Sequence, residues 1–325
     1  MQNFQPIEYH LTRDFSHKMN ATFEFIKQNW KSLGKATLFI AGPPVLIAGL
    51  IMGSSFANMF TLGNINADPD AALQLFSSPM FWLQFCLAMI LFLLSSVMSI
   101  ATINNYVLLY EELRTNEIPT ALVWERVRKT FWTYFGTTIY FFFTFIVLIC
   151  IVAIPVGIMS ALSPVLMVFV IWVLFIGVFY LMFSVSLTFI IRSYEGLGFF
   201  EAMARSFKLV KGKWWSTFGL ILILYFIMGT ISYIPMLPLY VIMGVSALHN
   251  VSADPSANPL EGMSTLTTIL MGLYYMIQLL LSALPNVGIA FQYFNLVEMK
   301  EAKGLMSSID SFGESPTAPQ NDETY

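Results

Sequence analysis

The chain has 325 residues, of which 57% are hydrophobic and only 11% are charged. Soluble domains carry roughly 25% charged residues, so this composition excludes a soluble protein and indicates one that lives in a lipid bilayer. The formal net charge is only −3, but the 16 Lys and Arg residues are unevenly placed, in clusters at 13–35, 114–129, 192–213 and 300–303.

A motif of Trp, three residues and Gly occurs three times, at Trp30–Gly34, Trp132–Gly136 and Trp215–Gly219. Each copy ends a basic, amphipathic stretch and opens an apolar segment that is too long for a helix of a soluble core. A second long apolar segment follows each time. We interpret the chain as three tandem copies of one unit, an interfacial helix followed by a transmembrane hairpin.

The first unit (19–110) follows a polar cytoplasmic segment, residues 1–18, and begins with a helix over 19–33 whose apolar residues recur every three or four positions. Such a helix lies along the lipid headgroups, with Trp30 at the interface. We expect Gly34 to let the chain turn into the first span, and the prolines of that span to bend it. The spans of this unit are predicted at about 36–57 and 80–109, joined by an outer loop at 58–79.

The second and third units, 117–194 and 198–297, follow the same plan. Their spans are predicted at about 136–160, 165–191, 219–246 and 264–297, with an outer loop at 247–263 and a cytoplasmic C-terminal tail at 298–325. The predicted fold is an all-α integral membrane protein with six transmembrane helices, arranged as three tandem hairpins that are each preceded by a cytoplasmic amphipathic helix. All four basic clusters then share one side, so the positive-inside rule predicts that both termini are cytoplasmic.

Asp, Glu, Lys, Arg and His are absent from all six predicted spans. Proton-coupled pumps, voltage sensors and carriers of charged solutes usually keep such a group at membrane depth. Intramembrane proteases need paired Asp residues, a Ser with a His, or a zinc-binding motif. We therefore expect no enzyme, no catalytic, cofactor-binding or metal-binding residues, and no nucleic-acid partner.

Two sets of residues are candidates for a functional site. Basic and aromatic residues of the interfacial stretches either bind anionic lipid headgroups or only fix the topology: Trp30, Lys31, Arg126, Arg128, Trp132, Arg205, Lys208, Lys211 and Trp215. Polar residues of the spans either line a polar cavity or only form hydrogen bonds between helices: Asn104, Gln278, Asn286 and Gln292.

Residues 195–219, EGLGFFEAMARSFKLVKGKWWSTFG, resemble a segment of a broad group of bacterial membrane proteins. That group includes the YciC-like proteins and the membrane domain attached to some glycerophosphodiester phosphodiesterases. Residues 291–305, FQYFNLVEMKEAKGL, are similar to the ending of uncharacterised relatives from Bacteroidetes. The resemblance implies a bacterial inner-membrane protein, but the soluble phosphodiesterase barrel is missing here, so it implies no catalytic role.

Two functions fit these observations. The first is a non-enzymatic membrane scaffold or accessory protein, whose cytoplasmic face engages membrane lipids, including anionic ones, and a protein partner or a second copy of the chain. The alternative is a transporter or channel for a neutral or lipid-like solute. A cavity lined by the polar residues of the spans favours the alternative, and a sealed apolar interior excludes it.

Overall fold

The computed structural model describes residues 5–61, 76–250, 264–302 and 306, and within them it contains helices and no strands. The predicted outer loops (58–79 and 247–263) and the predicted tail (298–325) lie largely outside the described residues. The elements in chain order are α1 (Phe15–Thr61), α3 (Pro79–Leu113), α4 (Thr120–Leu162), α5 (Pro164–Ser184), α6 (Thr188–Glu195), α7 (Phe199–Val210), α8 (Trp214–Ser232), the 3-10 turn η1 (Ile234–Met236), α9 (Leu237–Asn250), α10 (Ser264–Leu281) and α11 (Ala283–Glu301).

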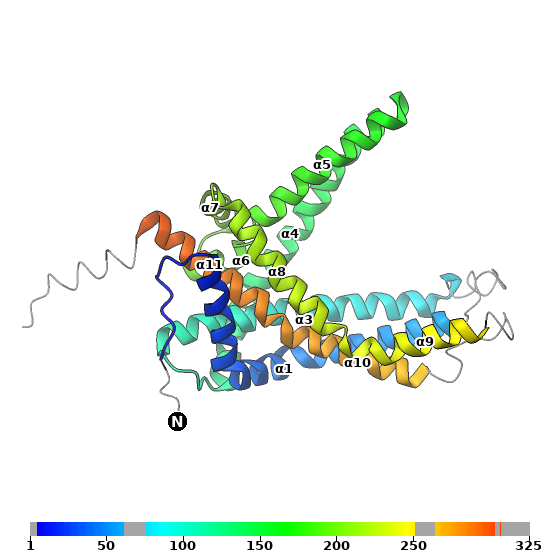
Figure 1. Ribbon diagram of the computed structural model, residues 1–325, viewed down its shortest axis with the longest axis horizontal. Helices are drawn as coiled ribbons and strands as arrows, with labels where there is room; N and C mark the ends of the chain where they lie inside the picture. Colours follow the sequence, from blue (N-terminus) through cyan, green and yellow to red (C-terminus); the bar gives the residue numbers. More distant parts are fainter. Residues whose placement is uncertain (1–4, 62–75, 251–263, 303–305, 307–325) are drawn as a thin grey trace, which may run out of the picture.

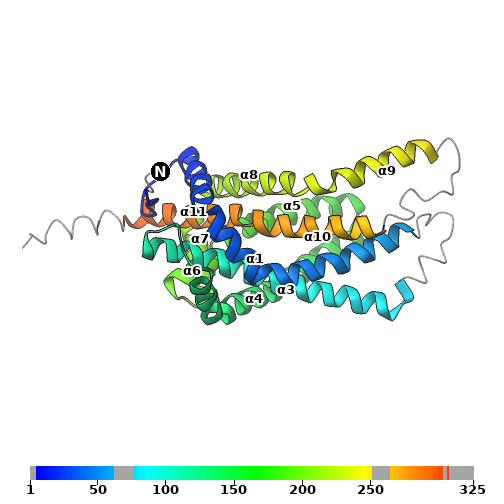
Figure 2. The same ribbon diagram turned by 90° about the horizontal axis from the view of Figure 1, so that it is seen from below.

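Six helical segments in the described part of the chain are long and apolar enough to cross a bilayer, whose hydrocarbon core needs about 20 residues. This confirms the predicted all-α fold with six apolar helices of spanning length, and it indicates a multi-pass membrane protein. Figures 1 and 2 show that successive segments alternate in direction. The starts of α1, α4 and α8 and the ends of α3, α6 and α11 therefore meet at one end, which we call the basic end.

The predicted interfacial helices are not all separate elements. α1 and α4 continue without interruption through Gly34 and Gly136, because neither glycine is followed by a capping turn. Only the third stretch is divided from its span, since Gly212 adopts a positive φ of 82° between α7 and α8, a conformation that glycine tolerates best. In Figure 1, α1 nevertheless begins steeply across the basic end and then turns along the long axis.

Proline placement explains where the last two spans are interrupted. Pro235 lies in η1, which separates α8 from α9, and Pro285 lies in the first turn of α11, directly after α10. A proline cannot donate the backbone hydrogen bond to the fourth residue before it, so each of these spans becomes two shorter helices. Pro43 and Pro44, in contrast, remain inside the continuous helix α1.

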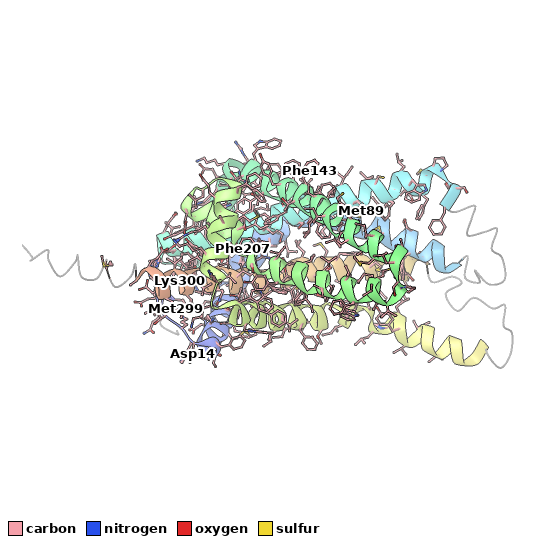
Figure 3. The ribbon with its side chains drawn as sticks, turned by 90° about the horizontal axis from the view of Figure 1, so that it is seen from above. Asp14, Met89, Phe143, Phe207, Met299 and Lys300 are labelled. Atoms are coloured by element: carbon pink, nitrogen blue, oxygen red, sulfur yellow. The ribbon has the colours of Figure 1, made fainter. Side chains whose placement is uncertain are left out.

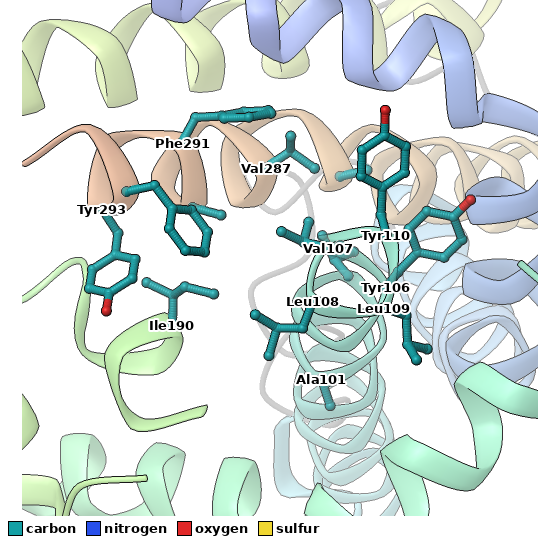
Figure 4. Packing of buried hydrophobic residues seen from close by; sticks show 14 of the residues in the cluster. Ala101, Tyr106, Val107, Leu108, Leu109, Tyr110, Ile190, Val287, Phe291 and Tyr293 are labelled. Carbon is teal, nitrogen blue, oxygen red and sulfur yellow. The ribbon is translucent and has the colours of Figure 1, made fainter. Parts of the chain in front are cut away.

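The largest cluster of buried apolar residues lies at the basic end, where α1, α3, α6 and α11 converge (Figure 4). Its largest members are aromatic, and their rings meet edge-on or tilted. Buried tyrosines need a partner for the hydroxyl group, and three of them find one on another segment. At 2.9 Å each, Tyr9 donates to the Val107 carbonyl, Tyr106 to Asn29 Oδ1 and Tyr110 to Gln28 Oε1.

The α4–α5 hairpin stands apart from the other helices (Figure 1). In the most apolar stretch of α1, 50% of the residues are buried within the protein, and for α3 the share is 39%, whereas for α4 and α5 it is 0%. α5 contacts mainly α4, whereas α4 also packs on α3, with its buried residues Val123, Val127, Tyr134 and Thr137 all in its first half. In a bilayer, lipid tails cover apolar side chains as well as protein does, so this hairpin is free to diverge.

Glycines allow α1 and α10 to approach closely. Gly49 and Gly53 lie one turn apart on α1, and they face the backbone of Thr268 and Gly272 on α10. A Cβ atom at position 53 would lie 2.8 Å from the Thr268 Cα, closer than any real contact of this kind. Small residues at this spacing are the usual basis of tight helix packing in membranes.

Gly53→Ala should force α1 and α10 apart and lower stability by about 1–3 kcal/mol, the usual cost of overpacking. The measurement is the thermal unfolding midpoint of the purified full-length protein in one detergent. Gly229→Ala is the matched control, because no atom lies within 4 Å of the added methyl group. Equal midpoints for the two variants would contradict the proposed close packing.

Candidate functional site

A cleft with a volume of about 600 Å³ lies at the fork between the α4–α5 hairpin and the other helices. Ligand pockets in proteins typically have volumes of 300–1,000 Å³. The walls come from α3, α4, α5, α6, α8 and α11, so segments far apart in the sequence meet here. Apolar side chains dominate the lining, including Phe141, Phe179, Phe183, Ile221 and Ile289.

The cleft opens at the protein surface among exposed side chains and extends inward to buried ones. Met182, Leu222 and Tyr225 are exposed on the surface that faces lipid, whereas Asn104 and Ile221 are buried. Tyr225 lies eleven residues after the start of α8, which is ~16 Å along a helix that rises 1.5 Å per residue. If α8 crosses the bilayer, the cleft lies within the hydrocarbon core, which is ~30 Å thick.

Of the four polar residues predicted for a cavity, the structure brings Asn104 and Asn286 together in this lining. The Asn286 side chain also donates to the Ser282 carbonyl at 2.7 Å. Gln278 is half-buried on α10 and is not part of the lining. Gln292 lies elsewhere, buried at the basic end, where it accepts from Lys18 Nζ at 2.7 Å. The cleft is thus mainly apolar with two amides, not a continuous polar channel.

The hairpin is joined to the other helices by polar and aromatic contacts near the cleft. Trp214 of α8 stacks on Tyr180 of α5, and its ring nitrogen donates to the Tyr180 carbonyl at 3.1 Å. Arg192 of α6 donates to Thr137 Oγ1 of α4 at 2.7 Å. These contacts lie at the basic end of the hairpin, so the far end of the fork is held by none of them.

The three motif tryptophans are the most exposed large residues of their stretches. Trp30 is 62%, Trp132 is 73% and Trp215 is 77% exposed. Tryptophan at the membrane–water boundary is a common anchor, and this exposure is what such a role requires. Lys31 lies 5.5 Å from the centre of the Trp30 ring, which places a cation beside the first of these residues.

Arg205 binds carboxylates of its own chain. Its side chain is only 17% exposed and forms ion pairs with Glu195, at 3.2 Å, and with Glu301. Hydrogen bonds to Glu301 and Glu195 raise the pKa of Arg205 above its ordinary value, despite its partial burial. Tyr293 donates to Glu195 at 2.7 Å, so this cluster joins α6, α7 and α11. The carboxylates occupy most of the Arg205 donors, which leaves few of them to bind a lipid headgroup.

The other predicted basic residues differ in their surroundings. Arg126 pairs with Glu112 at 2.5 Å on an exposed surface. Lys208 and Lys211, at the end of α7, offer their carbonyls to Lys300 Nζ at 2.6 and 2.9 Å, which ties α11 to that helix end. Arg128 is exposed on α4.

The sequence reading missed the polar side of α1. The predicted apolar face of residues 19–33 is divided: Phe23 and Trp30 are exposed, as expected for side chains that face lipid, whereas Leu33 is buried in the protein. The opposite stripe, Lys18, Thr22 and Asn29, is buried inside the protein. These three polar residues recur at helical spacing, and this periodic pattern is the feature of the sequence that could have predicted the buried face of α1.

The N-terminal segment was also missed as part of the core. Ile7 N donates to the Tyr110 hydroxyl at 3.1 Å, and Tyr9 is buried among the aromatic rings of the basic end. His10 lies 3.2 Å from Glu111. Residues 5–14 therefore cross the basic end as a strap, which no apolar periodicity in this polar stretch predicts.

The fold and the cleft define a multi-pass, all-helical membrane protein. The chain belongs to the family described as a domain of unknown function (DUF8558), whose model matches residues 66–284. No curated protein and no solved structure matches the chain. The resemblance to YciC-like proteins and to the phosphodiesterase membrane domain stays a prediction.

Arg205→Ala should lower the thermal unfolding midpoint strongly, because it leaves Glu195 and Glu301 without their cation in a partly buried place. We expect a loss of about 2 kcal/mol, within the range for hydrogen bonds to charged groups. Lys129→Ala is the control, since the Lys129–Glu125 pair at 2.7 Å is exposed on both sides and such pairs contribute little. A control variant as unstable as Arg205→Ala would refute the structural role of the cluster.

Proposed function

We propose that this protein is a non-enzymatic integral membrane scaffold or accessory protein that engages membrane lipids. One lipid chain, or a lipid-like neutral molecule, binds in the cleft between the α4–α5 hairpin and the other helices. The basic end faces the cytoplasm of a bacterial inner membrane, with both termini on that side, and engages headgroups and a protein partner or a second copy.

The observation that supports this proposal is the composition of the cleft. Its lining is mainly apolar, it opens among exposed side chains of α5 and α8, and it ends at Asn104 and Asn286. An apolar tail gains nothing by leaving lipid for such a cleft unless it also meets a matching polar group. The two amides supply donors and acceptors for an ester or hydroxyl group, so a lipid-like molecule fits better than a plain hydrocarbon.

The tandem-repeat interpretation and the charge distribution support the cytoplasmic placement. All 16 Lys and Arg residues lie in the four clusters that border the basic end or follow α11. The positive-inside rule assigns such an end to the cytoplasm. The exposed tryptophans of the three motifs are then at the level of the inner-leaflet headgroups.

A second candidate function, transport of a neutral or lipid-like solute, is favoured by the same cleft. Asn104 is buried at its inner end, so polar groups are available inside the bundle. Passage across the bilayer needs a second opening, and liposomes with a fluorescent lipid in one leaflet test for it. Transfer that depends on the protein and is abolished by filling the cleft would establish the transport function.

Filling the cleft tests lipid binding directly. Ile289→Trp on α11 and Ser186→Trp, just after α5, introduce large side chains at two places in the lining. The probe is a phospholipid with a photoreactive group on its acyl chain. Wild-type protein should be labelled in α5 or α8 at the cleft, and each variant about tenfold less. That loss corresponds to the burial of about two methylene groups.

The control for this experiment is Leu166→Trp on α5, which is exposed and outside the cleft lining. Its labelling should match the wild type in amount and position. Labelling spread evenly over the exposed faces of α4 and α5, or unchanged by Ile289→Trp, would refute a bound lipid in the cleft.

A further inference from the structure

A second, smaller pocket lies at the basic end, between the strap, α1, the start of α8 and the end of α11. Its volume is about 400 Å³, and three of its lining side chains, Arg13, Lys18 and Lys213, are cations. The remaining lining residues are Thr12, Asp14, Phe15, Ser216, Asn295, Leu296 and Met299. Figure 3 labels Asp14 and Met299 at this end, near Lys300.

Lys18 is the unusual residue of this pocket. It is only 3% exposed, and its ammonium group donates to Ser216 Oγ at 2.8 Å and to Gln292 Oε1 at 2.7 Å. Both partners are neutral, and among the described residues no carboxylate lies within 4.0 Å of its nitrogen. A buried charge is costly unless an opposite charge accompanies it. The structure thus holds a buried cation whose counter-ion is not a side chain of its described neighbours.

A chain of hydrogen bonds fixes the orientation of these groups. Gln292 Nε2 donates to Thr217 Oγ1 at 2.8 Å, so the amide oxygen of Gln292 is directed to Lys18. On the other side, the backbone N–H of Arg13 donates to Asn295 Oδ1 at 2.6 Å. The positions of Lys18 and Arg13 are therefore set by α11, before any ligand binds.

The charge balance of the pocket is positive. The Arg13 guanidinium lies 5.7 Å from the centre of the Phe291 ring, and its hydrogen bonds among the described residues go to the neutral carbonyls of Tyr9 and Glu8. Lys213 is exposed at the rim. Asp14 supplies the one carboxylate of the lining, and it already accepts from the backbone N–H and the ring of His17 at 2.8 Å each. Three cations therefore face one carboxylate that is paired elsewhere.

The start of α8 adds to this positive field. α8 is 19 residues long, and its N-cap residue, Lys213, makes no side-chain capping bond. The first N–H groups of a helix carry a partial positive charge and attract anions. Ser216 lies in this first turn and already contacts Lys18, so the helix terminus and the buried cation belong to the same pocket.

We propose that this pocket binds a phosphate group, either that of an anionic phospholipid headgroup or a free phosphate ion, through Arg13, Lys18 and Lys213. A phosphate has enough oxygens to accept from all three cations at once. Phe15 of the lining and Trp215, which precedes Ser216, are both exposed and apolar, as suits the level where a headgroup meets its acyl chains. The inference deepens the proposed lipid engagement and rests on it for the membrane placement, but it involves none of the residues of the cleft.

The test uses full-length protein in an uncharged detergent, with two probes: short-chain phosphatidic acid and inorganic phosphate. Binding is measured by native mass spectrometry and by the shift of the thermal unfolding midpoint. Arg13→Gln and Lys213→Gln should each weaken binding about fivefold, the effect of one cation close to an anionic group. Lys18→Gln should weaken binding more, and because it changes a buried residue, the two other variants keep the test valid if it fails to fold.

Lys211→Gln is the matched control, since Lys211 lies two residues before Lys213 but outside the pocket lining. Binding of phosphatidic acid alone would assign the pocket to a headgroup, and binding of both probes would assign it to the phosphate group as such. No binding, or equal weakening in Lys211→Gln, would overturn the proposal. Ile289→Trp, which fills the cleft, should leave phosphate binding unchanged, so failure of the cleft and failure of the pocket are distinguishable.

Discussion

The need to satisfy polar groups inside the protein governs this structure. A lipid core offers no water to backbone or side-chain donors, so buried polar residues must find partners within the chain. Here they are concentrated at the basic end, where Tyr106 bonds to Asn29, Tyr293 to Glu195 and Lys18 to Gln292. The spans beyond that end carry mainly apolar surface and are held mostly by close packing, as between α1 and α10, with few interhelical hydrogen bonds such as that from Ser95 Oγ to the Ala41 carbonyl at 2.8 Å.

This division explains why the α4–α5 hairpin diverges. Its contacts with the other helices are concentrated at the basic end, through Trp214, Arg192 and the buried Val123 and Val127 of α4. Further along, α4 and α5 carry Phe, Ile and Val side chains that lose nothing when lipid replaces protein around them. The separation of the hairpin from the other helices therefore costs little free energy. It leaves a cleft with two amides at its inner end.

The sequence predicted the spans well because a long apolar run has only one stable environment. It could not predict which face of a helix meets lipid and which meets protein, since both can be apolar. On α1 the apolar Trp30 is exposed and the apolar Leu33 is buried, and the polar Lys18 and Asn29 are buried as well. Nor could spacing indicate that Asn104 and Asn286 converge, or that Arg205 pairs with a glutamate 96 residues away, because these depend on tertiary packing.

The two candidate sites lie on the same helix but on different faces. Ser216 lines the phosphate pocket, and Ile221 and Tyr225 line the cleft. Nine residues of α-helix turn by two and a half turns and advance ~13 Å, so Tyr225 points almost opposite to Ser216. A single lipid would have to wrap around α8 to occupy both sites. The geometry therefore favours two separate ligands, each bound on its own face of α8.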